Sequence, residues 1–239
     1  SVPRVLTCLQ LHVSKKVLVP MAEIQKLEFD SDALGIPVAK LLAQTLTEED
    51  LQLSLKNASQ RGFRLLFWST SREHACALET YARSLGHFCS SKVKYTAHLN
   101  KSLLSALQHA ANETCECDVE KVSGDAISAD LLDLSLLAGR DSRFMNDPNL
   151  SYQQFEQIYS SWMKNSVKGS AADVLLVAKV ASKLVGAVTV KANRAQKLST
   201  IDLLAVHQDH ESIGKALVLA AFRWSFAQGF TACDIVTQL

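Results

Sequence analysis

The stretch TIDLLAVHQDHESIGKAL, residues 200–217, predicts a strand that runs through a short loop into a helix. Residues 198–206 are mostly apolar and indicate the strand, and residues 207–211 form the loop. Apolar residues then recur at the helical spacings of three and four, at Ile213, Leu217, Ala220, Trp224 and Ala227. Gly229 is expected to end the helix, and residues 231–237 indicate a further strand.

The beginning of this helix is suited to hold an anion. The first peptide N–H groups of a helix have no partner within it, and the helix dipole favours negative charge there. Ser212 is expected to cap the helix, Gly214 lets a phosphate approach the backbone, and Lys215 adds a positive charge. A purely structural turn, with a glycine that permits close packing, explains the same residues and stays open.

Upstream of this stretch, the second half of the chain has clear sequence signals for helices and strands. Residues 127–138 have helical apolar spacing up to Gly139. Ser151 and Gln154 form a capping box for a helix that Gly169 ends. Strands are predicted at 173–180 and 184–190, with the polar pair 182–183 as the turn. The predicted order is two helices, three strands, a loop, a helix and a strand.

The first part of the chain predicts strands and helices in alternation, which is typical of an α/β layer structure. Strands are predicted at 37–43, 63–68 and 88–99, and residues 27–35 are expected to form a loop. Helices are predicted from Thr47, with Asp50 as partner, and from Thr70 to residue 85. The polar stretch 112–124 predicts a boundary between an N-terminal domain, 1–115, and a second domain, 116–239.

Composition narrows the class of protein. The 239 residues are 48% hydrophobic and 21% charged, which excludes a disordered chain. The 25 Lys and Arg nearly balance the 24 Asp and Glu, which argues against a general nucleic-acid binder. No apolar stretch approaches the roughly 20 residues of a membrane span, and no secretory signal is recognisable. We therefore expect a cytoplasmic protein without a membrane span.

Six cysteines are scattered through the chain, which is too long to need disulfides for stability. Cys115 and Cys117 are separated by one residue rather than the usual two, and no second pair of ligands stands at a matching distance. No metal site is predicted.

Residues 200–206 and 212–217 together resemble motif A of the GNAT acyltransferases. The resemblance implies an α/β (α+β) acyl-CoA N-acyltransferase fold, with a mixed central sheet flanked by helices and a smaller α/β domain before it. It implies acetyl-CoA as co-substrate, with its pantetheine arm beside the strand end. The residues implied to bind it are Leu204, Ala205, Val206, Glu211, Ser212, Ile213, Gly214, Lys215 and Ala216. Ser212 replaces the usual first glycine of the loop, and Asp209 stands where the family has Gln or Arg.

Residues 138–144 and 155–169, with 27–35, are similar to a branch of that family, the dTDP-fucosamine acetyltransferases. The resemblance implies a nucleotide-linked amino sugar as acceptor, a role in surface-polysaccharide synthesis and a homodimer. Arg143 and Phe144 would contact the acceptor, since a guanidinium pairs with phosphate oxygens.

The reaction implied is direct attack of an amine on the thioester, with N–H groups of residues 204–206 polarising the carbonyl. Asp202 could orient the amine or a water, or be a solvated strand end. The family's proton donor is a Tyr that would lie beyond Leu239, so no catalytic residue is assigned and the chain is expected to lack the last helix and strands. Two alternatives remain: a non-catalytic module of the same fold, and an acetyltransferase of protein N-termini or small amines.

Overall fold

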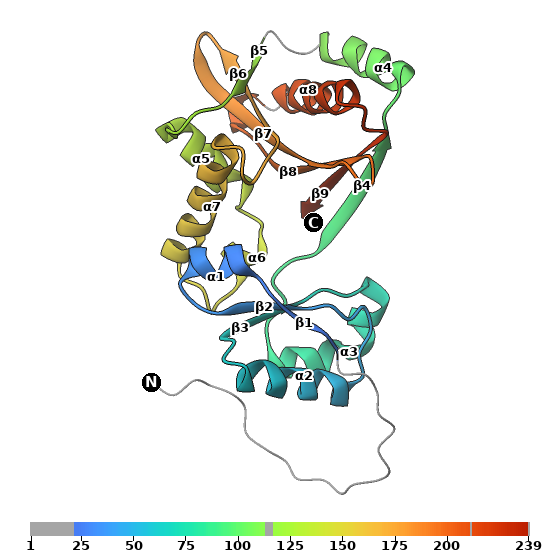
Figure 1. Ribbon diagram of the computed structural model, residues 1–239, viewed down its shortest axis with the longest axis vertical. Helices are drawn as coiled ribbons and strands as arrows, with labels where there is room; N and C mark the ends of the chain where they lie inside the picture. The colour runs from blue at the N-terminus through green and yellow to red at the C-terminus, as the bar shows by residue number, and fades with distance from the viewer. Residues whose placement is uncertain (1–21, 113–116, 211, 239) are drawn as a thin grey trace, which may run out of the picture. The chain divides into compact units, whose positions relative to one another are not determined.

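The computed structural model of the chain describes residues 22–112, 117–210 and 212–238 (Figure 1). Contacts divide the chain into two compact units, residues 1–88 and 89–239. Each unit has its own sheet, and each is described by itself.

The first unit is built on a three-stranded sheet in the order β1-β2-β3. Strand β2 pairs antiparallel with β1 and parallel with β3. Its strands are β1 (Ile24–Lys26), β2 (Val38–Leu41) and β3 (Leu65–Trp68), and its helices are α1 (Glu28–Leu34), α2 (Glu48–Gln60) and α3 (Arg72–Leu85). The capping box predicted for α2 is confirmed: the side chains and backbones of Thr47 and Asp50 exchange hydrogen bonds.

Two local predictions in this unit are wrong. Residues 27–35 were expected to form a loop, but residues 28–34 form helix α1, which Gly35 ends at a φ of 67°. The hydroxyl of Ser31 donates to the carbonyl of Leu27 and accepts from the N–H of Val38, so contacts with β2 hold a polar stretch in a helix. Thr70 does not cap α3, because the helix begins at Arg72 and the Thr70 hydroxyl donates to the carbonyl of Gln44, 2.6 Å away.

The second unit contains a six-stranded mixed sheet in the order β4-β9-β8-β7-β6-β5. All neighbours are antiparallel except β8 and β9, which are parallel. The strands are β4 (Lys92–His98), β5 (Asp118–Val122), β6 (Val174–Val180), β7 (Lys183–Asn193), β8 (Leu198–Val206) and β9 (Ala232–Gln238). The predicted order of helices and strands after residue 124 is confirmed except for one short helix, α6 (Arg143–Asn146), which was not predicted.

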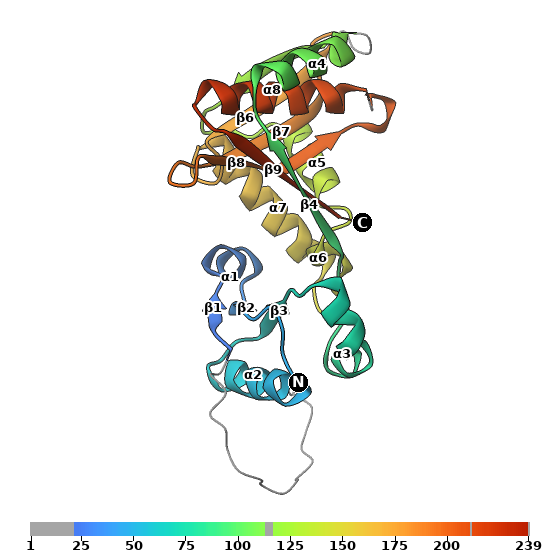
Figure 2. The same ribbon diagram turned by 90° about the vertical axis from the view of Figure 1, so that its right-hand side faces the viewer.

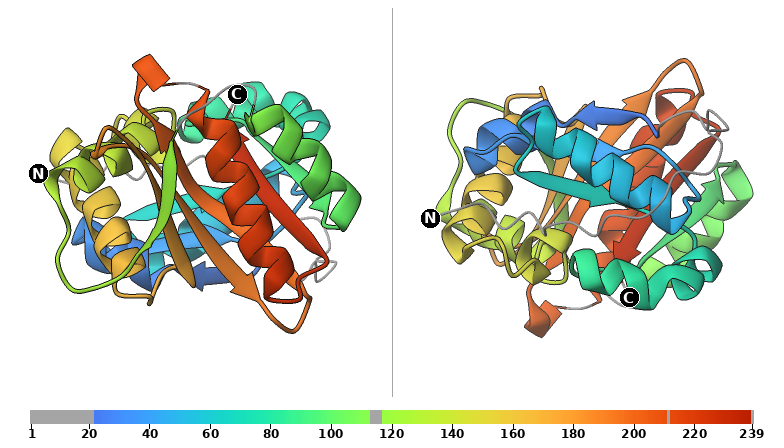
Figure 3. Two further views of the ribbon diagram at one scale, coloured as in Figure 1. Left: turned by 90° about the horizontal axis from the view of Figure 1, so that it is seen from above. Right: turned by 90° about the horizontal axis from the view of Figure 1, so that it is seen from below.

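Helices cover both faces of this sheet. One face carries α4 (Lys101–Asn112) and α8 (Ile213–Ala227), which lie side by side in Figure 3; we call it the α8 face. The other carries α5 (Ala129–Ala138) and α7 (Tyr152–Val167), which contact each other and are connected in the chain through the short α6 (Arg143–Asn146); we call it the α7 face. The core under α8 includes Val188, Ile201 and Leu217.

Strand β4 joins the sheet from the beginning of the unit. It pairs with β9 along its whole length, from Lys92 opposite Gln238 to His98 opposite Ala232. Residues 89–112, placed before the boundary at 115 by the sequence analysis, therefore pack with the second unit. The polar stretch 112–124 predicts a surface connection, but it does not reveal that β4, before it, pairs with β9, more than 130 residues further along the chain.

The turns and caps of this unit follow local chemistry. The capping box of Ser151 and Gln154 is confirmed at the start of α7. The β6–β7 hairpin is confirmed with its turn one residue earlier than predicted, at Ala181 and Ser182, whose φ angles are 47° and 66°. Two consecutive positive φ angles are the geometry that suits the twist of a two-residue hairpin.

Candidate functional site

Strands β8 and β9 are paired over only part of their lengths. Within the described residues, the pairing runs from Leu198 opposite Ala232 to Ile201 opposite Ile235. Beyond this point β8 continues along β7 to Val206, and β9 continues along β4 to Gln238, as Figure 2 shows for β9 and β4. The parallel strands therefore enclose a notch whose edges are unpaired backbone, which we call the β8–β9 notch.

A β-bulge lies on β8 where the notch begins. Thr189 of β7 is opposite Leu203 and Val190 is opposite Ile201, so Asp202 is the extra residue between them. The fully buried hydroxyl of Thr189 accepts a hydrogen bond from the N–H of Leu203, 2.9 Å away. This bond satisfies a backbone group that the bulge removes from the regular ladder.

Replacing Thr189 with valine is expected to lower the free energy of unfolding by about 1–2 kcal/mol, because the buried N–H of Leu203 loses its acceptor. Thr189→Ser keeps the hydroxyl and is the matched control, expected to lose less. Chemical denaturation of the three proteins measures the difference. Equal stability of the valine and serine variants would contradict the role given to the hydroxyl.

Two peptide N–H groups of β8 point into the notch. The N–H groups of Leu203 and His207 point toward β7, where they bond Thr189 and the carbonyl of Val185. Because N–H groups alternate in direction along a strand, those of Leu204 and Val206 point away from β7. Of the three strand residues predicted to contact the cofactor, Leu204 and Val206 thus present donors to the notch, and Ala205 does not.

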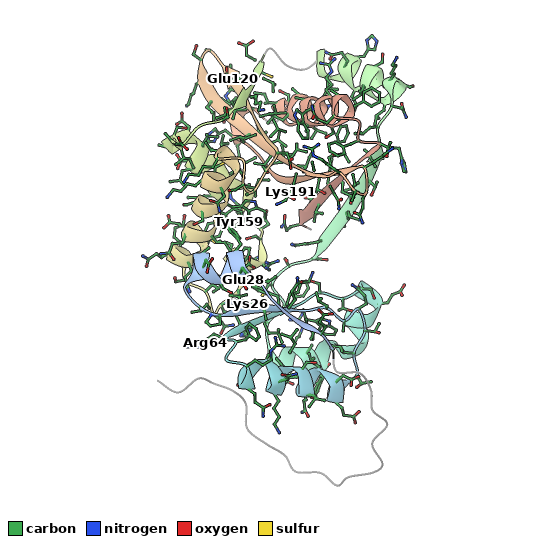
Figure 4. All side chains as sticks on the ribbon, viewed as in Figure 1. Lys26, Glu28, Arg64, Glu120, Tyr159 and Lys191 are labelled. Atoms are coloured by element: carbon green, nitrogen blue, oxygen red, sulfur yellow. The ribbon has the colours of Figure 1, made fainter. Side chains whose placement is uncertain are left out.

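Asp202, the bulge residue, carries an ionisable side chain at the beginning of the notch. Burial raises the pKa of its carboxyl to about 6, against the opposing effect of the Lys191 ammonium on β7, labelled in Figure 4. Ile201 and Leu204 pack on the α8 face, so the bulge places Asp202 and Leu203 on the α7 face. The sequence left Asp202 open between a substrate contact and a solvated strand end, because a bulge has no signal in the local pattern.

The N-terminus of α8 has a different geometry from the one expected. Ser212 is in the N-cap position but has helical backbone angles and makes no side-chain cap, so its predicted capping role is wrong. Ile213 is buried, whereas Lys215 is exposed. A Cβ on Gly214 would lie 3.9 Å from Val206 Cγ2, which leaves space beside the backbone.

Two other residues near the start of α8, Ala216 and Glu211, were also predicted to bind the cofactor. Ala216 is half-buried in the first turn of α8, and Glu211 lies outside the described residues. The described part of the segment therefore offers open backbone at Gly214 and one exposed cation, Lys215.

A cleft of about 300 Å³ lies beside the loop that follows β8, residues 207–210. It is bounded by the end of α5, the beginning of β7 and the loop that follows β8. Its lining residues are Leu137, Arg140, Lys183, Val185, His207, Gln208, Asp209 and His210. Two cations and two histidines against one carboxylate favour an anionic ligand; we call this hollow the basic cleft.

The two residues predicted to contact the acceptor belong to the packing of α6. Phe144 is buried and meets the ring of Tyr159 edge-on, with centroids 6.2 Å apart. The Arg143 guanidinium lies 4.3 Å from the centre of the Phe144 ring. Burial raises the pKa of the nearby Cys89 thiol to about 11, with Asp147 adding to the effect and Arg143 opposing it. Neither Arg143 nor Phe144 lines the basic cleft.

The tyrosines of this unit fall into two groups. Tyr159, which is labelled in Figure 4, is in the core between Phe155 and Trp162, as its place in the helical stripe predicts. Tyr95 on β4 and Tyr152 at the beginning of α7 are exposed.

The described residues offer neither a metal site nor a membrane-spanning helix. They contain no group of three or more His, Cys, Asp or Glu side chains arranged to hold a metal ion. Within the same residues, no helix combines the length and apolarity needed to cross a membrane.

Comparisons by sequence find no matching family model and no matching curated protein. Comparisons by structure do find relatives. A conserved protein of unknown function from Staphylococcus epidermidis aligns with 94% of this chain and 83% of its own, with a TM-score of 0.57 and 16% identity. A GCN5-related N-acetyltransferase from Kribbella flavida aligns with 92% of this chain and 78% of its own, with a TM-score of 0.50 and 13% identity. The predicted fold class is therefore confirmed: the chain has the mixed α/β fold of the GCN5-related N-acetyltransferases.

Proposed function

We propose that this protein is an N-acetyltransferase that uses acetyl-CoA. The observation that carries the proposal is the β8–β9 notch, in which two unpaired peptide N–H groups lie next to a carboxyl with a raised pKa. Acyl transfer needs donors for the developing oxyanion and an acceptor for the amine proton, and the notch supplies both.

The donor substrate would lie along the edge of β8. The peptide groups at the start of α8, around Gly214, with the exposed Lys215, would hold its pyrophosphate. The pantetheine arm would then follow the unpaired edge of β8, and the thioester carbonyl would accept from the N–H of Leu204 or Val206. This arrangement directs the acetyl group toward the bulge at Asp202.

Asp202 is the proposed general base. A carboxyl with a pKa of about 6 is mostly ionised at neutral pH and still basic enough to take a proton in the transition state. The amine nitrogen attacks the carbonyl carbon as its proton passes to Asp202. The carbonyl electron pair moves to the oxygen, and collapse of the intermediate breaks the C–S bond.

The basic cleft supports a nucleotide-linked amino sugar as the acceptor. Arg140 and Lys183 suit the diphosphate of such a molecule, and a polyamine or a basic peptide would be repelled by them. On this side the cleft begins at His207, the residue after the end of β8, which is five residues beyond Asp202, or roughly 16 Å at the strand rise per residue. An extended nucleotide sugar, for example a dTDP-linked 4-amino-4,6-dideoxyhexose of surface-polysaccharide synthesis in the cytoplasm, would bridge that distance.

Isothermal titration with acetyl-CoA tests the donor site. We expect Gly214→Phe to weaken binding at least tenfold, because its side chain would fill the space beside the α8 N-terminus while the fold has room for it. Gly86→Ala, at another glycine with open surroundings, is the control and should leave the affinity unchanged. Absence of binding at millimolar acetyl-CoA would favour a non-catalytic module, which the carboxylate of Asp209 in the loop already supports.

Steady-state kinetics with a dTDP-linked amino sugar tests the acceptor site. Arg140→Ala and Lys183→Ala are each expected to raise KM for the sugar about tenfold, because each removes a cation from the basic cleft. Lys179→Ala, which removes a cation of β6 that is paired with Glu120 of β5, is the matched control. If a peptide N-terminus or a polyamine is acetylated better than any nucleotide sugar, the acceptor assignment is wrong.

A further inference from the structure

His207 and His210 lie one turn apart in the loop that follows β8. Residues Gln208–His210 form a short 3-10 helix, η1, and the N–H of His210 donates to the carbonyl of His207, 2.9 Å away. Side chains three residues apart in a 3-10 turn are eclipsed, so the two imidazoles leave the backbone on the same side. Both histidines line the basic cleft.

Backbone contacts hold this pair of histidines against the sheet. The N–H of His207 donates to the carbonyl of Val185 on β7, 2.9 Å away, and Val185 is itself buried and lines the cleft. Both histidines are half-buried, whereas Gln208 and Asp209 between them are exposed. The two imidazoles therefore form part of the wall of the basic cleft, and the residues between them belong to its rim.

The charge of the basic cleft depends on the protonation of this pair. Among the described residues that line it, the other charged side chains are Arg140 after α5, Lys183 at the beginning of β7, and Asp209. Together these three side chains give the cleft a single positive charge when both histidines are neutral, and protonation of both raises it to three. Histidine is the side chain that ordinarily changes its charge between pH 5 and 8, so a site with two of them can vary its charge in that range.

The ligand proposed for this cleft has a fixed negative charge. Each phosphate in the diphosphate of a nucleotide sugar is a diester, which stays ionised throughout the neutral range. A protonated imidazole has two N–H donors, and its hydrogen bonds to phosphate oxygens are charge-assisted and therefore stronger than those of the neutral ring. Coupling between two ligands is reciprocal, so a ligand that prefers the protonated cleft also draws protons onto it.

We propose that His207 and His210 bind the diphosphate of the acceptor as imidazolium ions, so that the cleft takes up protons when the acceptor binds. Arg140 and Lys183 supply the constant part of the attraction, and the histidine pair supplies the part that depends on pH. The protons come from solvent and return to it when the product leaves. This inference rests on the proposed acceptor site and adds to it a binding pair whose strength falls as the pH rises.

Isothermal titration with dTDP-glucose tests the histidine pair without catalysis. This probe has the diphosphate but no amine, so its charge is the same at pH 6 and pH 8 and no acetyl transfer follows. We expect the wild type to bind it about tenfold more tightly at pH 6. The double variant His207→Gln, His210→Gln should bind it equally at both pH values, because glutamine is polar but takes up no proton. His109→Gln, at an exposed histidine of α4, is the matched control and should keep the pH dependence of the wild type.

Proton uptake provides a second readout, which a purely structural role of the histidines would not produce. At pH 7.5 the binding enthalpies in HEPES and in Tris differ in proportion to the protons taken up, which we expect to be roughly half a proton or more for the wild type and about none for the double variant. If the wild type binds dTDP-glucose equally at both pH values, or the double variant keeps the difference, the role of the histidine pair is wrong while the proposed acceptor site stands. If the wild type binds the probe at neither pH, the acceptor assignment fails and this proposal fails with it.

Discussion

Asp202→Asn is expected to lower kcat/KM for acetyl transfer about 100- to 1000-fold, because the amide cannot accept the proton of the attacking amine. The substitution keeps the size and shape of the side chain at the bulge. Affinity for acetyl-CoA should stay within about threefold, since the proposed donor site is formed by the backbone of β8 and α8 and not by this carboxylate. Steady-state kinetics and isothermal titration on the same preparations separate the two effects.

The pH profile of the wild type provides an independent measure of the same residue. The carboxyl of Asp202 must be ionised to act, so kcat/KM should fall below a midpoint near pH 6, the pKa to which burial raises it. Lys191 is the cation that limits the rise of this pKa. Lys191→Met should therefore move the midpoint to higher pH. A midpoint near 4 in the wild type would contradict the buried base.

The stability of Asp202→Asn shows whether a loss of activity comes from loss of the carboxylate or from unfolding. The pKa of the Asp202 carboxyl is about 6 in the folded protein, against the ordinary 3.8. Its ionisation therefore lowers the free energy of unfolding above about pH 6, and this cost disappears as the pH falls from about 6 to 3.8. Asp202→Asn should thus be at least as stable as the wild type at pH 7. Asp141→Asn, at an exposed carboxylate, is the control for both activity and stability. An unstable Asp202→Asn protein would show that the carboxylate has a structural role.

Gly139→Ala is expected to lower the free energy of unfolding by about 3 kcal/mol, because one methyl group cannot fit between α5 and α7. A Cβ at this position would lie 2.5 Å from two ring atoms of Tyr159 and 2.8 Å from Phe155. The Tyr159 ring is itself buried against Phe144 and Trp162, so it has little room to move. Urea or thermal denaturation measures the loss.

Gly214→Ala is the matched control for stability. Neither glycine has a positive φ, so alanine is compatible with the backbone at both positions. A Cβ on Gly214, however, would lie 3.9 Å from Val206 Cγ2, which is an ordinary van der Waals contact. We expect Gly214→Ala to be as stable as the wild type or slightly more so, since alanine favours a helix. Similar stability of the two variants would show that α5 and α7 separate easily to admit the methyl group.

Local patterns in the chain were enough to predict most of the individual elements. The capping boxes at Thr47 and Ser151 fixed where two helices begin, and apolar spacing from Ile213 onward predicted α8. These signals are reliable because they arise between residues three or four apart, within one turn of helix. They were wrong at Thr70 and at residues 27–35, where a partner from another element takes the hydroxyl.

The candidate site depends instead on pairing between distant segments. The sequence identified the strand 198–206 and the helix start at Gly214, but not that Asp202 is a bulge residue, nor which N–H groups face the notch. The pairing of β4 with β9 was not predicted either, because the two strands are more than 130 residues apart and meet only in the sheet. Helix signals are local, whereas the partner, register and bulge of a strand are set by hydrogen bonds to other strands. The sequence by itself therefore determined most of the helices and strands, and only the folded sheet decided which of their residues lie together at the candidate site.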